Sequence, residues 1–264
     1  MTTKTVLLTG ASGRIGRCVR YALREDYCLV CFNRSDIPDL GPNERLVRGD
    51  TADAAALEQA ARGAEVIVHL AGVSDVAPFR ERLLPVNILG TYNVFEAARL
   101  AGVPRVIYAS THQVMGFYPA GQRIDANAPY RPSSMYAVTK CFGEAMGRLY
   151  ADKAGLQVIC LRIGLFRDRP LDERHLAVWI SPGDMGRLVR ASVAAPDIHY
   201  EVVYGISRNT RRWWDLDRAR EVLGYDPQDD AEAYAPTLLR APPSAWLERI
   251  ERQGGEKTEL PFMP

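Results

Sequence analysis

The amino-acid sequence predicts an α/β fold in which helices cover both faces of a mostly parallel, doubly wound sheet. Short apolar runs alternate with amphipathic stretches through the first 165 residues, and strands that alternate with helices form right-handed crossovers. The run at 66–71 is almost continuously apolar, as expected for a strand buried on both faces. A glycine-rich turn joins the first expected strand to the first expected helix and completes the pattern.

The first part of the chain contributes most of the expected sheet. Strands are expected at 5–9, 28–33, 66–71, 106–110 and 158–163. Helices are expected at 14–24, 52–62, 88–101 and 136–154. We therefore assign residues 1–164 to a core of this type and residues 165–264 to a small C-terminal lobe with an arm, the two being interleaved in one compact unit.

The alternation weakens after Gly164. Residues 165–178 are rich in Arg, Asp and Pro and predict a loop or an irregular lobe. Ser181 is typical of a helix N-cap, because a proline and an acid follow it in the first turn. Further elements are expected at 200–204 (a strand) and at 215–223 (a helix that Gly224 ends). The tail from residue 241 onward predicts a surface arm.

Charge and composition exclude several classes of partner. The chain has 264 residues with 33 Lys and Arg against 32 Asp and Glu, a net charge of +1. This balance predicts neither nucleic acid nor a membrane as partner, and the apolar runs are too short to cross a bilayer. The first residues lead directly into an apolar strand without a separate signal segment, so we expect a cytoplasmic location.

The five cysteines and four histidines predict neither a disulfide framework nor a metal site. Cys28 and Cys31 form a C-x-x-C inside an expected strand, where residues i and i+3 point to opposite faces. We interpret both as core cysteines. The histidines lack the spacing of metal ligands.

The glycine-rich turn at 9–16 has the spacing G-x-x-G-x-x-G. A turn of this kind between a strand and a helix lets the backbone approach a pyrophosphate, which rests on the amides of the helix N-terminus. The alternative is a purely structural tight turn. We expect the following residues to bind a dinucleotide: Gly10, Ser12, Gly13, Arg14, Ile15 and Gly16.

The end of the second expected strand predicts which dinucleotide is bound. Folds of this type usually place an acid there for the adenosine ribose, but this chain has Asn33 followed by Arg34. A guanidinium pairs with a 2′-phosphate that a carboxylate would repel, so we favour NADP over NAD, with dual use allowed. Arg34 as a solvated loop charge is the alternative. Further cofactor contacts are expected from strand ends at Asp50, Thr51, Leu70, Ala71, Gly72 and Ile163.

Tyr136 and Lys140 lie four residues apart on an expected helix and therefore share one face. A fixed ammonium stabilises a phenolate, which can take a proton from a substrate hydroxyl as hydride leaves the same carbon. Thr111, or alternatively Ser110, ends the fifth expected strand and can bind the substrate oxygen. Asn87 is expected either to hold a water or backbone group behind the lysine or to cap a helix.

These motifs together resemble the short-chain dehydrogenase/reductase superfamily in its extended, epimerase/dehydratase-like branch, which has a Rossmann-type fold. The resemblance also rests on His69-Leu-Ala-Gly72, on Asn87-Ile-Leu-Gly-Thr-Tyr and on Leu223-Gly-Tyr-x-Pro227. Within the branch the chain is most similar to the uronate dehydrogenase family, up to about residue 234. The segments that carry this closer similarity are 71–74, 115–119, 140–144, 162–164 and 214–215, together with Arg174 and Trp179.

The resemblance implies an activity and a set of roles. The family oxidises the anomeric carbon of a hexuronate to an aldarolactone with a nicotinamide cofactor. By position, Tyr136 would be the base and Lys140 its modulator. Sugar hydroxyls would be bound by Ser74, Thr111 and His112, and Arg174 would clamp the carboxylate. The two long helices would pair across a homo-oligomer.

The chain departs from the family pattern at three places. Ser110-Thr111-His112-Gln113 stands where the family has Ser-Ser-Asn-His, Leu165 replaces a serine, and Asn33 replaces an acid. Two other functions therefore remain open. One is a nucleotide-sugar epimerase or dehydratase, which the short C-terminal part disfavours. The other is an NADP-sensing regulator without chemistry, which would not need the Tyr–Lys pair.

Overall fold

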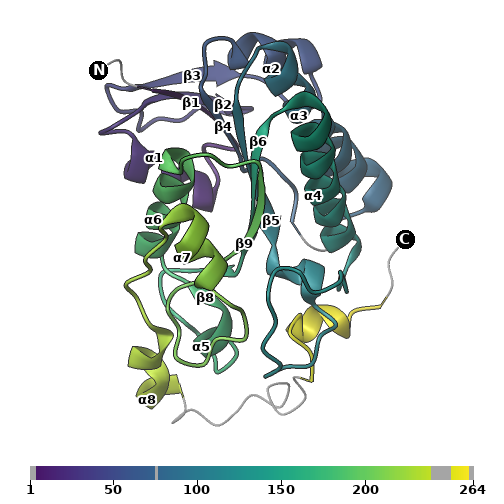
Figure 1. Ribbon diagram of the computed structural model, residues 1–264, viewed down its shortest axis with the longest axis vertical. Helices are drawn as coiled ribbons and strands as arrows, with labels where there is room; N and C mark the ends of the chain where they lie inside the picture. The colour runs from purple at the N-terminus through teal and green to yellow at the C-terminus, as the bar shows by residue number, and fades with distance from the viewer. Residues whose placement is uncertain (1–3, 75–76, 239–250, 262–264) are drawn as a thin grey trace.

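The computed structural model describes residues 4–74, 77–238 and 251–261. It confirms the predicted α/β fold with a seven-stranded sheet in the order β3-β2-β1-β4-β5-β6-β9 (Figure 1). All six strand pairings in this sheet are parallel. The strands are β1 (Thr5–Thr9), β2 (Cys28–Asn33), β3 (Glu44–Arg48), β4 (Val66–His69), β5 (Arg105–Thr111), β6 (Gln157–Ile163) and β9 (Tyr200–Gly205).

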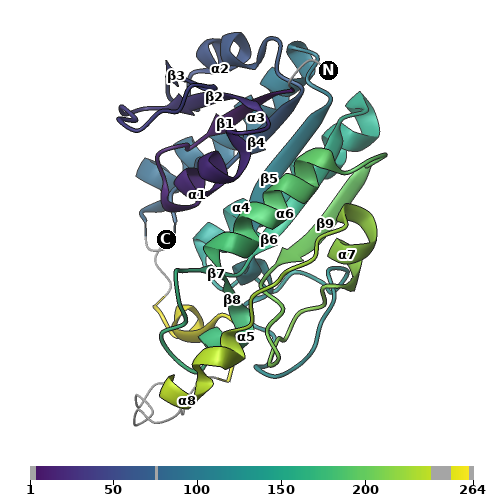
Figure 2. The same ribbon diagram turned by 90° about the vertical axis from the view of Figure 1, so that its left-hand side faces the viewer.

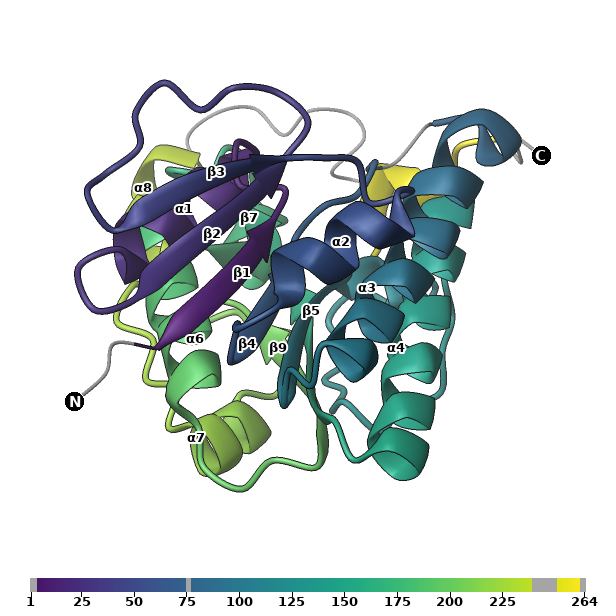
Figure 3. The same ribbon diagram turned by 90° about the horizontal axis from the view of Figure 1, so that it is seen from above.

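Helices cover both faces of the sheet, as the alternating pattern predicts. Figure 3 shows α1, α6 and α7 on one side and α2, α3 and α4 on the other. These helices are α1 (Arg14–Leu23), α2 (Ala54–Ala61), α3 (Gly90–Leu100), α4 (Met135–Ala154), α6 (Pro182–Ala194) and α7 (Asp217–Leu223). Apolar side chains of the strands bury against each helical layer and form two core clusters, one on each face.

The residues after Gly164 add to this sheet and also build structure at its end. β9 pairs with β6, and α6 begins with Ser181 as its N-cap, whose Oγ accepts from the Asp184 N–H at 2.9 Å. The two-stranded sheet of β7 (Leu165–Phe166) and β8 (Trp179–Ile180) lies near α5 (His175–Val178) and α8 (Ala235–Leu238) (Figure 2). The division into a core and a lobe stays a prediction.

Four details differ from the sequence-based expectations. Residues 165–178 are not an irregular loop, because they contain β7 and α5. A π-helix, Phe79–Leu89, precedes α3 in a stretch where the sequence predicted no element before residue 88. Cys28 is exposed at the first position of β2, so of these two residues only Cys31 is a core cysteine. The tail was expected to be a surface arm. Residues 239–250 lie outside the described part, but the segment 251–261 packs on the body and buries Gln253.

The contact between α4 and β5 predicts a stability effect. A Cβ at Gly143 would lie 2.1 Å from Cζ of Tyr108, whose ring is fully buried. Gly143→Ala should therefore lower the free energy of unfolding by about 1–3 kcal/mol, because the ring must move within a packed core. Urea unfolding of both proteins measures the change. An unaltered midpoint would mean that this contact tolerates a methyl group.

Candidate active site

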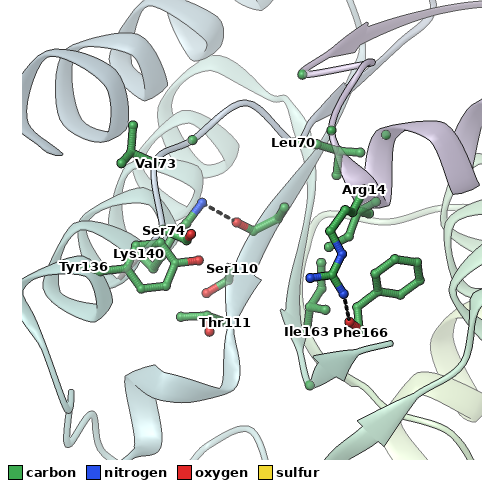
Figure 4. Close-up of a pocket in the computed structure, with 17 residues that line it drawn as sticks. Arg14, Leu70, Val73, Ser74, Ser110, Thr111, Tyr136, Lys140, Ile163 and Phe166 are labelled. Carbon is green, nitrogen blue, oxygen red and sulfur yellow. Dashed lines mark hydrogen bonds between the residues drawn. The ribbon is translucent and has the colours of Figure 1, made fainter. Parts of the chain in front are cut away.

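A crevice opens at the edge of the sheet where β1, β4, β5 and β6 end (Figure 4). The parallel register brings Thr9 beside His69, and Thr111 beside Ile163, so polar strand ends meet at one edge. Two adjoining pockets share the glycine turn and the residues that follow β4. This is where open α/β sheets place their ligand sites.

The glycine turn between β1 and α1 approaches the end of β4 so closely that side chains cannot fit. Gly10 has a φ of +72°, and a Cβ there would lie 2.7 Å from the Ala71 nitrogen. A Cβ at Gly16 would lie 2.3 Å from the Gly10 carbonyl oxygen. The turn therefore presents bare backbone to the crevice, which is the cradle that a pyrophosphate requires.

One pocket collects the residues expected at the adenosine end. It is lined by the predicted residues Gly10, Ser12, Gly13, Asn33, Arg34, Asp50, Thr51, Leu70, Ala71 and Gly72. Asn33 links the turn to the next loop, because its Oδ1 accepts from Ser12 Oγ at 3.0 Å and its Nδ2 donates to the Ser35 carbonyl at 2.8 Å. Arg34 is exposed, and its Nη1 lies 3.6 Å from Asp50 Oδ2.

The other pocket collects the residues expected at the reacting end. Tyr136 points its hydroxyl into the space that Ser74, Ser110 and Thr111 also line (Figure 4). Lys140 donates from Nζ to the Ala109 carbonyl at 2.7 Å and lies 5.7 Å from the centre of the Tyr136 ring. Burial lowers the pKa of Lys140 to about 8. The pair thus has the arrangement expected of a phenol whose ionised form is stabilised by an ammonium.

Asn87 holds backbone behind the lysine and does not cap a helix. Its Oδ1 accepts from the Val73 N–H at 2.8 Å, and its Nδ2 donates to the Val73 carbonyl at 2.9 Å. The same Nδ2 lies 3.1 Å from Thr139 Oγ1 on α4. Asn87 therefore fixes the loop that follows β4 against the helix that carries Tyr136 and Lys140.

Ser110 and Thr111 differ in their hydrogen bonding. Ser110 donates from Oγ to Glu144 Oε1 at 2.5 Å, and Glu144 is a buried carboxylate that pairs with Arg162 at 2.8 Å. Thr111 accepts from the Gln113 N–H at 3.3 Å, which leaves its own hydroxyl proton to be donated into the pocket. Thr111 is thus better placed than Ser110 to donate to a substrate oxygen.

His112 and Arg174 contact each other beside the pocket, and neither lines it. The ring of His112 is buried, its Nδ1 lies 3.0 Å from the Ile163 carbonyl, and its Nε2 lies 3.1 Å from Arg174 Nη2. Since a carbonyl only accepts, Nδ1 carries the proton and Nε2 accepts from the guanidinium. Burial and the charge of Arg174 lower the pKa of His112 to about 3, so the ring is neutral.

The two pockets therefore hold most of the predicted site. The reacting end also receives the predicted residues Arg14, Ile15, Gly16 and Ile163. Residues that the sequence reasoning missed also line the crevice, namely Phe32, Gly49, Val73, Val86, Ala109, Gly164 and Phe166. Phe166 is joined to the glycine turn, because Arg14 Nη2 donates to its carbonyl at 2.9 Å. The two residues are 152 positions apart in the sequence, so no local sequence pattern indicates this contact.

The described ranges offer neither a metal centre nor a membrane-spanning helix. Residues 4–74, 77–238 and 251–261 contain no cluster of His, Cys, Asp and Glu suited to a metal ion. The helices of the same ranges are all too short or too polar to cross a bilayer.

The burial of Lys140 predicts how stability depends on pH. Its pKa is about 8 in the folded chain against 10.5 normally, so the unfolded chain binds more protons between these values. Stability should then rise with pH over this interval relative to Lys140→Met, which has no such group. Urea unfolding of both proteins at several pH values from 7.5 to about 10.5 tests this. If the stability of both proteins changed with pH in the same way, burial would not lower the pKa of Lys140.

Known proteins share this architecture. A uronate dehydrogenase of Pseudomonas putida is 39% identical over 255 residues, which cover 95% of this chain and 94% of that protein. The crystal structure of uronate dehydrogenase from Agrobacterium tumefaciens has a TM-score of 0.92 at 38% identity, covering 100% of both chains. A mutant of that enzyme complexed with NAD has a TM-score of 0.92 at 37% identity, covering 99% of each chain.

The family comparison agrees with these matches. The model of the NAD dependent epimerase/dehydratase family matches residues 6–166, from β1 through β7. This span contains the glycine turn, Asn87 and the Tyr136–Lys140 pair. The chain belongs to the NAD dependent epimerase/dehydratase family.

Proposed function

We propose that this protein is an NAD-dependent dehydrogenase that oxidises a hexuronate at its anomeric carbon to an aldarolactone. The observation that carries the proposal is the convergence of Tyr136, Lys140 and Thr111 on one pocket that adjoins the glycine turn. Two relatives of nearly full length are uronate dehydrogenases, and one relative is described in complex with NAD. The residues present fit such a cofactor, because the bare backbone at Gly10 and Gly16 leaves room for a pyrophosphate.

The chain's own residues supply the acid–base part of the reaction. Tyr136, as a phenolate beside the Lys140 ammonium, takes the proton of the anomeric hydroxyl. A bound nicotinamide would supply the acceptor for the hydride of the same carbon, whose C–H bond would break as its carbon–oxygen bond becomes the lactone carbonyl. Thr111 donates a hydrogen bond to the oxygen that reacts. Lys140 keeps Tyr136 ionised, and the carbonyl of Ala109 keeps Lys140 in place.

Arg174 supports a uronate as the substrate. A guanidinium is suited to a carboxylate because it combines a permanent positive charge with N–H donors. His112 contacts Arg174 and directly follows Thr111 at the end of β5. The guanidinium of Arg174 is therefore held by the residue next to Thr111, which lines the pocket. Ser74 lines the pocket and would bind a sugar hydroxyl, whereas the same role expected for His112 does not fit, because both of its ring nitrogens already have partners. A neutral aldose would offer this guanidinium no carboxylate.

The cofactor proposal has a finer part. Asn33 carries no charge that would repel a 2′-phosphate, and Arg34 lines the same pocket. We therefore propose that the site also accepts NADP, with Arg34 as the partner of the 2′-phosphate. Asp50 opposes this, because its carboxylate lies 3.6 Å from the guanidinium and would compete for it.

A homo-oligomer is also part of the proposal. The described parts of α3 and α4 expose large apolar side chains, namely Tyr92, Leu100, Val138 and Leu149. Removing such a face from water favours association.

A substrate panel tests the proposed function directly. Hexuronates, neutral aldoses and nucleotide sugars are offered with NAD and with NADP, and nicotinamide absorbance is followed. We expect cofactor reduction with hexuronates above all other compounds. Turnover of a nucleotide sugar without net reduction would instead identify an epimerase or dehydratase, and cofactor binding without turnover of any compound would identify a sensor.

Replacing the base should stop the chemistry and spare binding. Tyr136→Phe removes the phenolate, so turnover should fall by roughly 10²–10⁴-fold while the dissociation constant of NADH stays the same. Steady-state kinetics and fluorescence titration with NADH measure the two quantities. Turnover at the level of the unaltered enzyme would reject Tyr136 as the base.

Replacing Arg34 should separate the two cofactors. Arg34→Ala removes a charge-assisted contact to the 2′-phosphate, worth about 1.5–3 kcal/mol, so KM for NADP should rise roughly tenfold or more. KM for NAD, which has no such phosphate, should change little. Equal changes for both cofactors would contradict the role given to Arg34.

A further inference from the structure

The segment 251–258 is built into the body of the molecule next to the active site. Figures 1 and 2 show it at the same end of the molecule as α5. The N–H of Gln253 donates to the Tyr118 carbonyl, and that of Gly254 donates to the Gly116 carbonyl, both at 2.8 Å. The segment is therefore anchored by its backbone to the chain that follows β5.

The side chain of Gln253 is fully buried and uses both ends of its amide. Its Oε1 accepts from Trp214 Nε1 at 2.7 Å. Its Nε2 donates to the carbonyls of Gln122 at 2.7 Å and Pro119 at 3.2 Å. A buried amide with every partner supplied by protein fixes its own backbone firmly.

The backbone of this segment holds Arg174. The Gln253 carbonyl accepts from Arg174 Nη2 at 2.7 Å and from Nε at 3.3 Å. Two residues further, Gly255 has a φ of +60°, and a Cβ there would lie 2.9 Å from Arg174 Nε. The glycine thus lets the chain pass directly against the guanidinium.

The contacts close into a ring of four residues. Arg174 donates to His112 Nε2 at 3.1 Å, and the His112 ring lies 5.0 Å from that of Trp214. Trp214 in turn holds the Gln253 side chain, and the Gln253 carbonyl holds Arg174. His112 remains an acceptor throughout, since its ring is neutral and its Nδ1 proton is bound by the Ile163 carbonyl.

We propose that Gln253 and Gly255 are positioning residues for the substrate carboxylate. They set the direction in which Arg174 offers its N–H donors, and so the final segment of the chain determines the preference for a sugar acid. This inference rests on the proposed function, in which Arg174 binds the carboxylate. A guanidinium free to rotate would lose part of the charge-assisted bonding that a fixed one provides.

The test compares two glycines that have the same backbone conformation. Gly255→Ala adds a methyl group against Arg174, whereas Gly102→Ala adds one at a φ of +70° where no atom lies within 4 Å. Backbone strain is therefore matched, and only the first variant displaces the guanidinium. KM for a hexuronate should rise roughly tenfold in Gly255→Ala, with the NAD dissociation constant unchanged. Gly102→Ala should retain both values.

A second variant acts from the other side of the segment. Gln253→Leu removes the bonds to Trp214, Gln122 and Pro119 while keeping the volume of the side chain. Made in the unaltered chain, it should raise KM for the hexuronate. Made in the Arg174→Ala background, it should raise KM no further, because the group through which it acts is absent. Urea unfolding of each protein confirms that kinetics are measured on folded enzyme.

The outcomes separate this inference from the proposed function. If the unaltered enzyme does not oxidise hexuronates, the proposed function fails. If it does, additive effects of Gln253→Leu and Arg174→Ala overturn the inference, as does a KM in Gly255→Ala equal to that of Gly102→Ala. A lower KM in Gly255→Ala would also overturn it, because the segment would then obstruct the site.

Discussion

The geometry of the site depends on one buried ammonium group. Lys140 is almost entirely removed from water, which is costly unless its N–H groups have partners. The Ala109 carbonyl at the end of β5 supplies one, and the ring of Tyr108, 4.9 Å away, adds the attraction of its face. These contacts hold α4 in a fixed position along β5. Tyr136, one turn earlier on the same face, is thereby directed into the crevice.

Local chemistry explains which parts could be predicted. Apolar runs and amphipathic stretches predicted the strands and helices, because the spacing of apolar residues within each element reflects which of its faces is buried. The glycine turn and the Tyr–Lys pair could be recognised in the sequence because each is formed by residues that lie close together along the chain. The sequence left two roles open for Asn87, helix capping and holding a water or backbone group. Only the structure distinguishes them, because its partner Val73 lies in a loop that has no periodic sequence pattern.

Long-range contacts explain what could not be predicted. The segment after residue 250 is rich in polar residues and glycine, a composition that usually indicates an exposed tail. Residues 253–255 are buried nonetheless, because the amides of Gln253 and Gly254 pair with carbonyls near residues 116–122 and Gly255 tolerates close approach to Arg174. Arg174 and Gln253 are 79 residues apart. No periodic pattern connects positions at that distance.

The two halves of the crevice are therefore fixed by different means. The dinucleotide half includes turns that directly follow β1, β2 and β4, so the local sequence of each turn indicates its place in the site. In the proposed function, the sugar half would be completed by Arg174 and by the residues that surround it, namely His112, Trp214 and the segment 251–258, which meet only when the chain is folded. Changes in this segment would then alter which sugar is bound without disturbing the glycine turn. Substrate preference would thus be separable from cofactor binding in physical terms.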